Sequence, residues 1–522
     1  MARRIIAARD VWIRSDHWPD AKDLGRWARD IFRLARARTD QQRAIALWQW
    51  LHICIARGGP IALEGERGLE VPVPDTLKYL TVYGVHYCDG LSRVMVNAWQ
   101  SAGAGSARKV VVKRLGHTVA ELRYKDADGV VRWHAFDPQQ GWYVFSRDGG
   151  HIASVAEIDA DLDLLLHPVN PPRPYFFAAG SRENYFQHPH DLHNAVWGDA
   201  PMPRHRMLLN LRRGERWRRL WAPGPQYWPL ARGERPKVVC YPWTERDSLG
   251  GGIADGFLGR YVEPYLYRTP RNGTAGTRRC RMPGTVELTY TVPLAGGRFA
   301  EGAKRAWRLA SEARASARRA TVHPTRLHQL GMLIYEVKTP YVIADAALET
   351  TVRSGSDPLD MLAIYVSTDG GELWTDVWGT IFARKGRLSP APRAIRAEFG
   401  SKAYLAGKFS VTGKYGYLVR IDFLARRDVG EVGLDALTLR TWCMCNMGAL
   451  PALLPGPNRV HVTTAEAPPE AKLRVEYLWH ERGRGERRVR KLLPARGGSF
   501  AVRVGGRVPA DVRMREVSLE LI

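Results

Sequence analysis

The chain has 522 residues, of which 45% are hydrophobic and 25% charged. This composition is typical of globular proteins and excludes a disordered tail, a collagen-like fibre and a small disulfide scaffold. No run of about 18 apolar residues occurs, so no membrane-spanning helix is expected. The first residues also lack the apolar stretch of a signal peptide. We therefore expect a cytoplasmic protein, unless a leader precedes this chain.

The net charge is +25, from 78 Lys and Arg against 53 Asp and Glu. Such a charge suits an anionic polymer as a nonspecific partner. The basic residues are mostly arginines spread along the whole chain, however, which favours a solvated surface over a specific nucleic-acid site. One stretch, residues 304–319, is densely basic. Its residues have the spacing of a short amphipathic helix.

Two helices are expected before residue 60. Residues 24–35 carry apolar side chains at helical spacing, which predicts one amphipathic helix. Thr39 and Gln42 then form the Ser/Thr-x-x-Glu/Gln pattern of a capping box, so a second, strongly apolar helix should begin there. Gly58-Gly59-Pro60 should stop it.

A helix and a hairpin are expected between residues 88 and 136. Residues 88–102 place apolar side chains on one helical face. Strand-like runs follow at 109–113, 117–124 and 130–136, and a turn containing Asp and Gly joins the last two. In the resulting antiparallel hairpin, Asp137 should lie beside His117 within about one residue of register.

This arrangement predicts a catalytic triad of Cys88, His117 and Asp137. The positive end of a helix favours a thiolate over a thiol at Cys88. Free backbone N–H groups at the same helix end can hold an oxyanion. Asp137 can orient the imidazole of His117, which then acts as the proton carrier. The chemistry needs no cofactor and no metal, and none is expected.

The motifs around these residues resemble the transglutaminase-like superfamily, a papain-like branch of the cysteine enzymes. The resemblance covers residues 26–165 and rests on Tyr87-Cys88-Asp89-Gly90, Gly116-His117-Thr118-Val119-Ala120-Glu121 and Trp133-His134-Ala135-Phe136-Asp137-Pro138. It implies an acyl-transfer enzyme that forms a thioester at Cys88 with an amide of a protein or peptide substrate. Hydrolysis by a peptidase or amidase is then favoured over cross-linking.

The chain also departs from that family pattern. His86 stands two residues before Cys88, where many members have Gly. The resemblance does not identify the side chain that donates to the oxyanion, and Tyr83 and Trp50 are candidates only.

The rest of the chain is expected to be β-rich, so the predicted fold class is α+β. An N-terminal transglutaminase-like core (residues 1–165) would precede mostly antiparallel β-sandwich domains. Residues 166–300 form a Pro/Gly/Trp-rich connecting region that is partly β. Residues 301–449 suggest a sandwich of the carbohydrate-binding kind, and residues 458–522 a small immunoglobulin-like one.

Ser367–Trp374 resembles the Asp-box of sialidases, but the motif occurs once instead of once per propeller blade. The motif predicts a hairpin in which Asp-Gly-Gly supplies positive φ angles. Trp374 and Trp378 can either stack on a sugar or fill the core. A polysaccharide partner is therefore an open alternative for this region.

Two groups of residues are weak candidates for a metal site. His188, His190 and His193 are close together but lie around Pro189, which favours a polar loop over a zinc site. Cys443 and Cys445 have one intervening residue, too few for a zinc knuckle. The alternative to the enzyme is a non-catalytic protein that binds a polysaccharide or a protein surface on the same scaffold.

Overall fold

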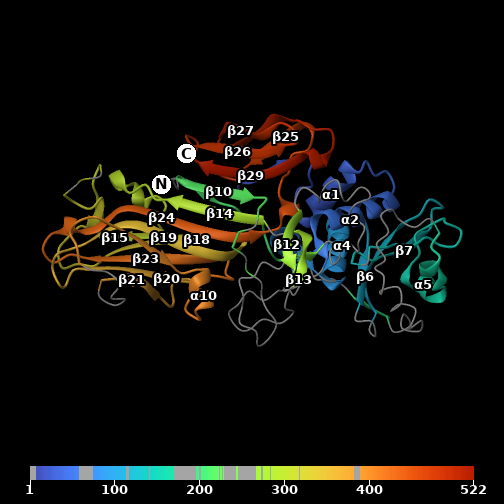
Figure 1. Cartoon of the computed structure of the whole chain (residues 1–522), viewed down its shortest axis with the longest axis horizontal. Coiled ribbons are helices and arrows are strands. Elements are labelled where there is room, and N and C mark those ends of the chain that lie inside the picture. Colours follow the sequence, from blue (N-terminus) through green and yellow to red (C-terminus); the bar gives the residue numbers. More distant parts are fainter. Residues whose placement is uncertain are drawn as a thin grey trace.

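The computed structural model describes most of the chain. The described residues are 7–57, 75–112 except 87, 117–169 except 140, 195–198, 202–222, 224, 225, 227, 284–380 except 315 and 317, and 388–522, with short strands between 243 and 281. Figure 1 shows an elongated molecule with α1, α2 and α4 at one end beside β6 and β7, and the large sheets at the other.

The structure is mostly β, with 43% strand against 20% helix. The predicted α+β class with a papain-like core is therefore wrong. The long helices lie in the N-terminal part of the chain, whereas the strands that dominate the molecule pair over long separations. For example, β10 (Glu215–Leu220) pairs with β29 (Val512–Leu521), and no local pattern reveals such a pairing.

The largest sheet is antiparallel and ten-stranded in the described part of the chain. Its main path is β16 (Leu309–Ser311), β17 (Val322–Pro324), β24 (Val432–Cys445), β14 (Gly284–Thr291), β10, β29, β26 (Lys472–Glu481) and β27 (Gly485–Pro494). Off this path, β19 (Val342–Ser354) pairs with β24 and with β22 (Arg393–Glu398).

Two smaller sheets accompany it. The five-stranded sheet has the order β15 (Arg305–Trp307), β18 (Gly331–Lys338), β23 (Gly416–Leu424), β20 (Met361–Ser367) and β21 (Thr375–Gly379). The three-stranded sheet has the order β2 (Trp12–Ser15), β25 (Gly456–Thr463) and β28 (Gly497–Val504). Buried side chains from these sheets and from the N-terminal helices form one continuous hydrophobic core.

The expected N-terminal helices are confirmed. α1 (Leu24–Leu34) buries Trp27 and Ile31, and α2 (Asp40–Cys54) begins at a capping box in which Thr39 and Gln42 bond each other's backbone N–H groups. Such a box satisfies two N–H donors that a helix end leaves without intrahelical partners. Residues 58–60, the expected stop signal, lie outside the described residues.

The helix and hairpin expected after residue 88 are also present. α4 (Cys88–Ser101) packs against a four-stranded sheet with the order β7 (Val131–Phe136), β6 (His117–Lys125), β5 (Ala107–Val112) and β8 (Ala195–Gly198). Short helices α5 (Val155–Ala160) and α6 (Asp163–Leu166) follow. A small second core joins α5 and α6 to this sheet through Val110, Val119 and Ala135.

The helix expected over residues 304–319 is wrong. The described part of this stretch contains the short strands β15 and β16 instead. β15 pairs with β18, and β16 pairs with β17. Helical spacing of apolar residues is a weak signal when a sheet edge offers backbone hydrogen bonds, and here the tertiary pairing decided the outcome.

The hairpin expected at Ser367–Trp374 is confirmed. It joins β20 to β21, and Gly370 and Gly371 have φ angles of 86° and 103°. Asp369 accepts hydrogen bonds from the hydroxyl of Ser367 and the backbone N–H of Leu373. These bonds, the hydroxyl bond foremost, hold the pKa of Asp369 below its usual value.

None of the described helices combines the length and the apolar character needed to cross a membrane. The chain is β-rich and built from several sheets, which agrees with the coarse expectation of a multi-part, sandwich-like architecture.

Candidate active site

His117 and Asp137 are in direct contact. Nε2 of His117 lies 2.6 Å from Oδ2 of Asp137, and the two side chains are 9% and 0% exposed. The hairpin register pairs Ala120 with Phe136. Continued by one step, this register places Asp137 diagonally across from His117 on the same face of the sheet, a distance that two polar side chains can bridge.

Cys88 meets the same imidazole from α4. The side chain of Cys88 hydrogen-bonds His117. The same ring holds Asp137 through Nε2. α4 is fixed in this position partly by Ser92, whose buried hydroxyl donates to the carbonyl of Thr118 at 3.0 Å. The structure therefore brings the three residues singled out in the sequence into one chain of contacts.

The electrostatic environment favours a protonated His117. Burial alone would lower its pKa, but the charge of Asp137, the hydrogen bond to that carboxylate and the contact with Cys88 outweigh burial and raise the pKa to about 10. The ordinary value is 6.5. An imidazolium between a carboxylate and a sulfur is the arrangement that stabilises a thiolate.

Asp137 is held in place by α2 and by its own turn. Its backbone carbonyl accepts hydrogen bonds from Nε1 of Trp48 and from the N–H groups of Gly141 and Trp142. Its second carboxylate oxygen, Oδ1, accepts from the N–H of Gln139 at 2.9 Å. The carboxylate is therefore fixed before any substrate arrives, as an orienting group requires.

The loop before Cys88 is fastened to the end of β24 by Asn446. Nδ2 of Asn446 donates to the carbonyls of Cys54 and Leu80 at 2.7 and 2.5 Å, and its backbone N–H donates to Thr81 at 2.9 Å. Gly84 passes so close that a Cβ there would lie 2.5 Å from the Asn446 side chain. The C-terminal part of the chain thus positions the entry to α4.

His86, the departure from the family pattern, is accommodated by Gly90 in the first turn of α4. A Cβ on Gly90 would lie 2.1 Å from the His86 ring. On its other side the ring packs on Tyr79, with centroids 4.1 Å apart. The pair His86 and Gly90 therefore sets how closely the loop approaches the first turn of α4.

Gly90→Ala should destabilise the protein, although alanine favours helices. The clash with a buried ring should cost roughly 1–3 kcal/mol of unfolding free energy, the usual range for overpacking. Urea unfolding of the single variant checks this. In the double variant His86→Ala/Gly90→Ala the added methyl group has room, so part of the stability should return. A single variant as stable as the parent would contradict the packing seen here.

The remaining motif residues hold the sheet together. Glu121 is fully buried and accepts from Arg108 and from the N–H of Val155, the first residue of α5. The guanidinium of Arg108 also lies over the Trp133 ring, 3.9 Å from its centroid. Glu121 and Trp133 are therefore joined through Arg108.

The two candidates for a side-chain oxyanion donor are both buried. Tyr83 is 2% exposed, at the end of the π-helical turn η1 (Tyr79–Tyr83). Trp50 is 4% exposed and packs edge-on against Trp18, 5.3 Å between centroids. Neither observation assigns the role, so both remain predictions. The backbone N–H groups at the start of α4 are the donors that the fold supplies.

The two cysteines considered as metal ligands lie in the core of the large sheet. Cys443 and Cys445 are fully buried on β24, and burial raises both thiol pKa values, that of Cys443 to about 12. Such thiols are unreactive. His188, His190 and His193 lie outside the described residues. Within the described chain, no group of three or more His, Cys, Asp or Glu could hold a metal ion.

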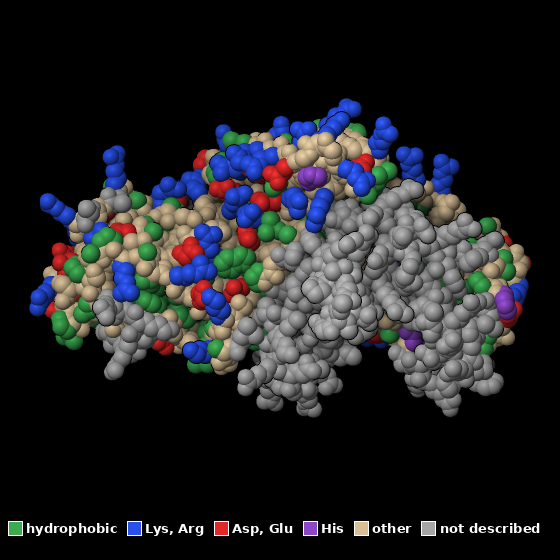
Figure 2. Space-filling view, viewed as in Figure 1, with side chains coloured by type: hydrophobic (Ala, Val, Ile, Leu, Met, Phe, Trp, Pro, Cys, Tyr) green, Lys and Arg blue, Asp and Glu red, His purple; other side chains and the backbone are tan. Residues whose placement is uncertain are grey.

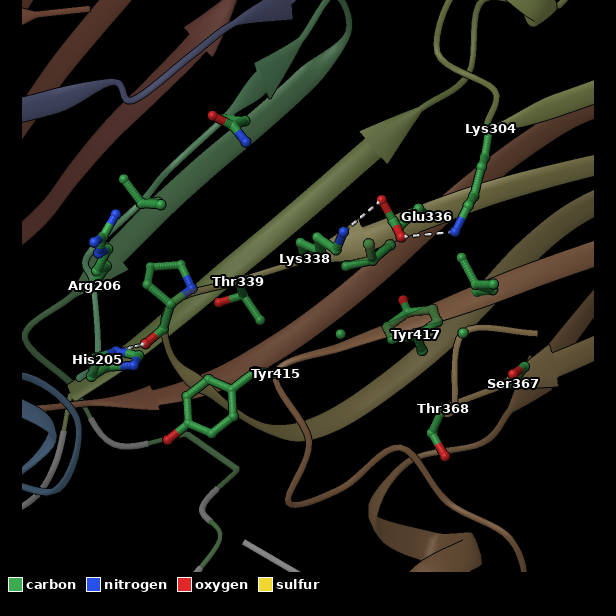
Figure 3. A pocket seen from close by; sticks show the side chains of 17 residues that line it. His205, Arg206, Lys304, Glu336, Lys338, Thr339, Ser367, Thr368, Tyr415 and Tyr417 are labelled. Atoms are coloured by element: carbon green, nitrogen blue, oxygen red, sulfur yellow. Dashed lines mark hydrogen bonds and ion pairs between the residues drawn. The ribbon is translucent and has the colours of Figure 1, made fainter. Parts of the chain in front are cut away.

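A separate cavity of about 680 Å³ lies beside the Ser367–Trp374 hairpin. Figure 3 shows Lys304 and Lys338 reaching Glu336 from two sides, with Tyr415 and Arg206 on other walls. The two lysines lie 3.2 and 3.1 Å from that carboxylate. Trp378 is buried, and Trp374 lies against Arg420 instead of lining the cavity.

The comparisons with known proteins identify no family. No family model matches the chain, and no curated protein matches it. Among solved structures, a xanthan lyase from Paenibacillus aligns with 9% sequence identity and a TM-score of 0.14. The alignment covers 46% of this chain and 33% of the lyase chain, so this chain spans about a third of that structure. A likeness at this level carries no argument about fold or activity.

Proposed function

We propose that the protein is a cysteine-dependent acyl-transfer enzyme that acts on amide bonds through a thioester at Cys88. The observation that carries the proposal is the chain of contacts from Cys88 through His117 to Asp137, with Nε2 of His117 2.6 Å from the buried carboxylate. A nucleophile, a proton carrier and an orienting acid in this order are the parts that such chemistry needs. The motif resemblance to transglutaminase-like enzymes supports the same assignment.

The proposed reaction has two stages. The Cys88 thiolate attacks the carbonyl carbon of the amide, and the oxyanion that forms is stabilised by backbone N–H groups at the start of α4. The C–N bond then breaks, and the imidazolium of His117 gives its proton to the leaving amine. In the second stage water attacks the thioester, His117 takes its proton, and the carboxylic acid leaves Cys88.

The activity depends on which molecule accepts the acyl group from the thioester. With water the enzyme is a peptidase or amidase, and with a second amine it is a cross-linking enzyme. The resemblance favours water, so hydrolysis of a protein or peptide substrate is our first assignment. No step requires a cofactor.

An acyl-donor probe that forms a stable bond to a nucleophilic cysteine tests the assignment. The parent protein should be labelled at Cys88, and Cys88→Ala should lose all labelling because it lacks the sulfur that contacts His117. Mass spectrometry of the labelled peptide gives the site. The matched control is Cys54→Ala, which removes a buried thiol and should leave labelling unchanged. Labelling that persists in Cys88→Ala would end the catalytic assignment.

The second candidate function is non-catalytic binding of a polysaccharide. The specific observation in its favour is the cavity beside the Ser367–Trp374 hairpin, whose volume of about 680 Å³ lies within the range of small-ligand sites. Tyr415, Thr368 and Asn210 line it with groups that suit sugar hydroxyls. Calorimetric titration of oligosaccharides onto Cys88→Ala distinguishes the two candidates, since binding there needs no thiol.

A further inference from the structure

Positive charge is concentrated in one segment near the C-terminus. Residues 481–507 contain nine Lys or Arg and two Glu, a net charge of +7 out of +25 for the whole chain. Figure 2 shows Lys and Arg side chains gathered along the upper rim of the molecule, where Figure 1 places β26 and β27. The sequence analysis singled out residues 304–319 and did not find this segment.

Most of the segment is an edge strand. β27 is the last strand on the main path of the ten-stranded sheet and pairs with β26 on one side. Within the described chain no strand pairs with its other side. β28, which follows it, pairs with β25 in a different sheet. Ten residues of strand leave an edge of about 33 Å with backbone N–H and C=O groups available.

A groove of about 500 Å³ runs between β27 and β28. Arg484, Arg487, Lys491 and Arg503 line it, and Glu481 is the carboxylate among the lining residues. Along β27, Arg487 and Lys491 are separated by an even number of residues, so alternation places them on one face of the strand with Val489 between them.

The carboxylates near the groove do not balance its cations. Glu481 is shared by Arg484 and Arg487 at 3.9 and 3.7 Å. Glu476 is likewise shared by two arginines, Arg488 and Arg490, at 3.3 and 2.7 Å, and Arg488 also lines the groove.

Lys491 and Arg503 are exposed, and no carboxylate in the described part of the chain forms an ion pair with either. A local excess of positive charge therefore surrounds an unpaired strand edge.

We propose that the edge of β27 and the adjoining groove bind an extended acidic polypeptide as an added strand. Backbone hydrogen bonds along a sheet edge give affinity, and side chains at alternate positions give specificity. The cations select acidic side chains in the incoming strand. They also repel a second copy of the same basic edge, which explains how a ten-residue edge stays available in a soluble sheet. The proposal does not depend on Cys88.

The groove suits a peptide better than a nucleic acid. Binding of single-stranded nucleic acid relies on exposed aromatic side chains for base stacking. The aromatic residue of this groove, Trp479, is 4% exposed and donates its Nε1 hydrogen to Glu481. A polysaccharide offers charge without the regular N–H and C=O ladder that a strand edge can pair with.

Two short peptides of alternating Glu and Val separate strand addition from charge alone. One carries ordinary amides, and the other is N-methylated at alternate residues, which removes backbone donors and keeps the charge. Fluorescence anisotropy at low salt should show binding of the first and at least about tenfold weaker binding of the second. Equal binding of the two peptides would overturn the strand-addition model.

Matched protein variants locate the site. Arg487→Gln/Lys491→Gln/Arg503→Gln should weaken binding of the first peptide about tenfold, because several exposed charge pairs are lost together. Arg314→Gln/Arg318→Gln/Arg326→Gln removes the same charge from exposed positions elsewhere and should keep binding within about twofold of the parent. Circular dichroism confirms that both variants fold. An equal loss in both would show that net charge, not this groove, binds the peptide.

Competition assigns the class of partner. Polygalacturonate and duplex DNA, matched to the peptide in concentration of negative charge, should displace the labelled peptide less effectively than unlabelled peptide does. Stronger displacement by either polymer would overturn the polypeptide assignment.

Discussion

Replacing Asp137 by Asn should lower the pKa of His117 from about 10 toward its ordinary value of 6.5. The charge of Asp137 and its hydrogen bond to Nε2 are the main contributions that raise this pKa against the effect of burial. Without them, burial disfavours the imidazolium. Because the proposed reaction needs the imidazolium to protonate the leaving amine, the basic limb of the activity profile should move from near pH 10 to near neutrality.

The same substitution should change how stability depends on pH. A folded-state pKa above the unfolded value means that the bound proton stabilises the folded protein fully below about pH 6.5. This stabilisation is lost as the pH rises toward 10, and in Asp137→Asn it should be largely absent throughout. Urea unfolding of both proteins between pH 6 and 10 measures the difference.

The matched control for this prediction is Glu157→Gln. Glu157 lies 2.7 Å from Nε2 of another histidine, His151, and its side chain is 40% exposed. The substitution therefore removes the acid of a second, more exposed histidine–carboxylate pair. It should leave the basic limb near pH 10. NMR titration of the His117 ring reads its pKa directly, and an unchanged value in Asp137→Asn would contradict the electrostatic account.

Replacing His117 by Gln should slow alkylation of Cys88 by iodoacetamide at pH 6 by about 100-fold. A neighbouring imidazolium favours the thiolate, which is the form of cysteine that reacts with iodoacetamide. The lower intrinsic nucleophilicity of a stabilised thiolate offsets part of the gain. The measurement is the rate of modification at Cys88, followed by mass spectrometry from pH 5 to 9.

His151→Gln controls for loss of a histidine in general. His151 pairs with Glu157 and Ser146 and has no contact with Cys88 in the described structure. Its substitution should leave the rate at pH 6 within about twofold of the parent. If His117→Gln reacts as fast as the parent at pH 6, Cys88 is not paired with the imidazole, and the proposed acyl-transfer chemistry loses its nucleophile.

The candidate active site is linked to the large sheet through Asn446. Asn446 ties the C-terminal end of β24 to the carbonyls of Cys54 and Leu80, ahead of the helix that begins at Cys88. The large sheets therefore support the site directly. Truncating the chain before residue 446 would expose these buried carbonyls, and unpaired buried carbonyls are costly.

Local sequence patterns were sufficient to predict the helices and the hairpin around the site. The capping box at Thr39, the apolar face of residues 88–101 and the Asp-Gly turn after residue 125 each act within a few residues, so their patterns predicted α2, α4 and the β6–β7 hairpin correctly. The hairpin alone placed Asp137 near His117. The residue types Cys, His and Asp in this order suggested the chemistry.

The remaining features depend on packing between elements that are far apart in the chain. Three contacts depend on how separate elements pack. They are the contact between Cys88 and His117, the hydrogen bond from Trp48 to the carbonyl of Asp137, and the packing of His86 against Gly90. The mostly β class, the strands at residues 305–311 and the basic edge of β27 likewise follow from pairings between segments far apart in the chain. Periodicity reports which side of a segment is apolar, but the partner that covers that side is chosen by the whole fold.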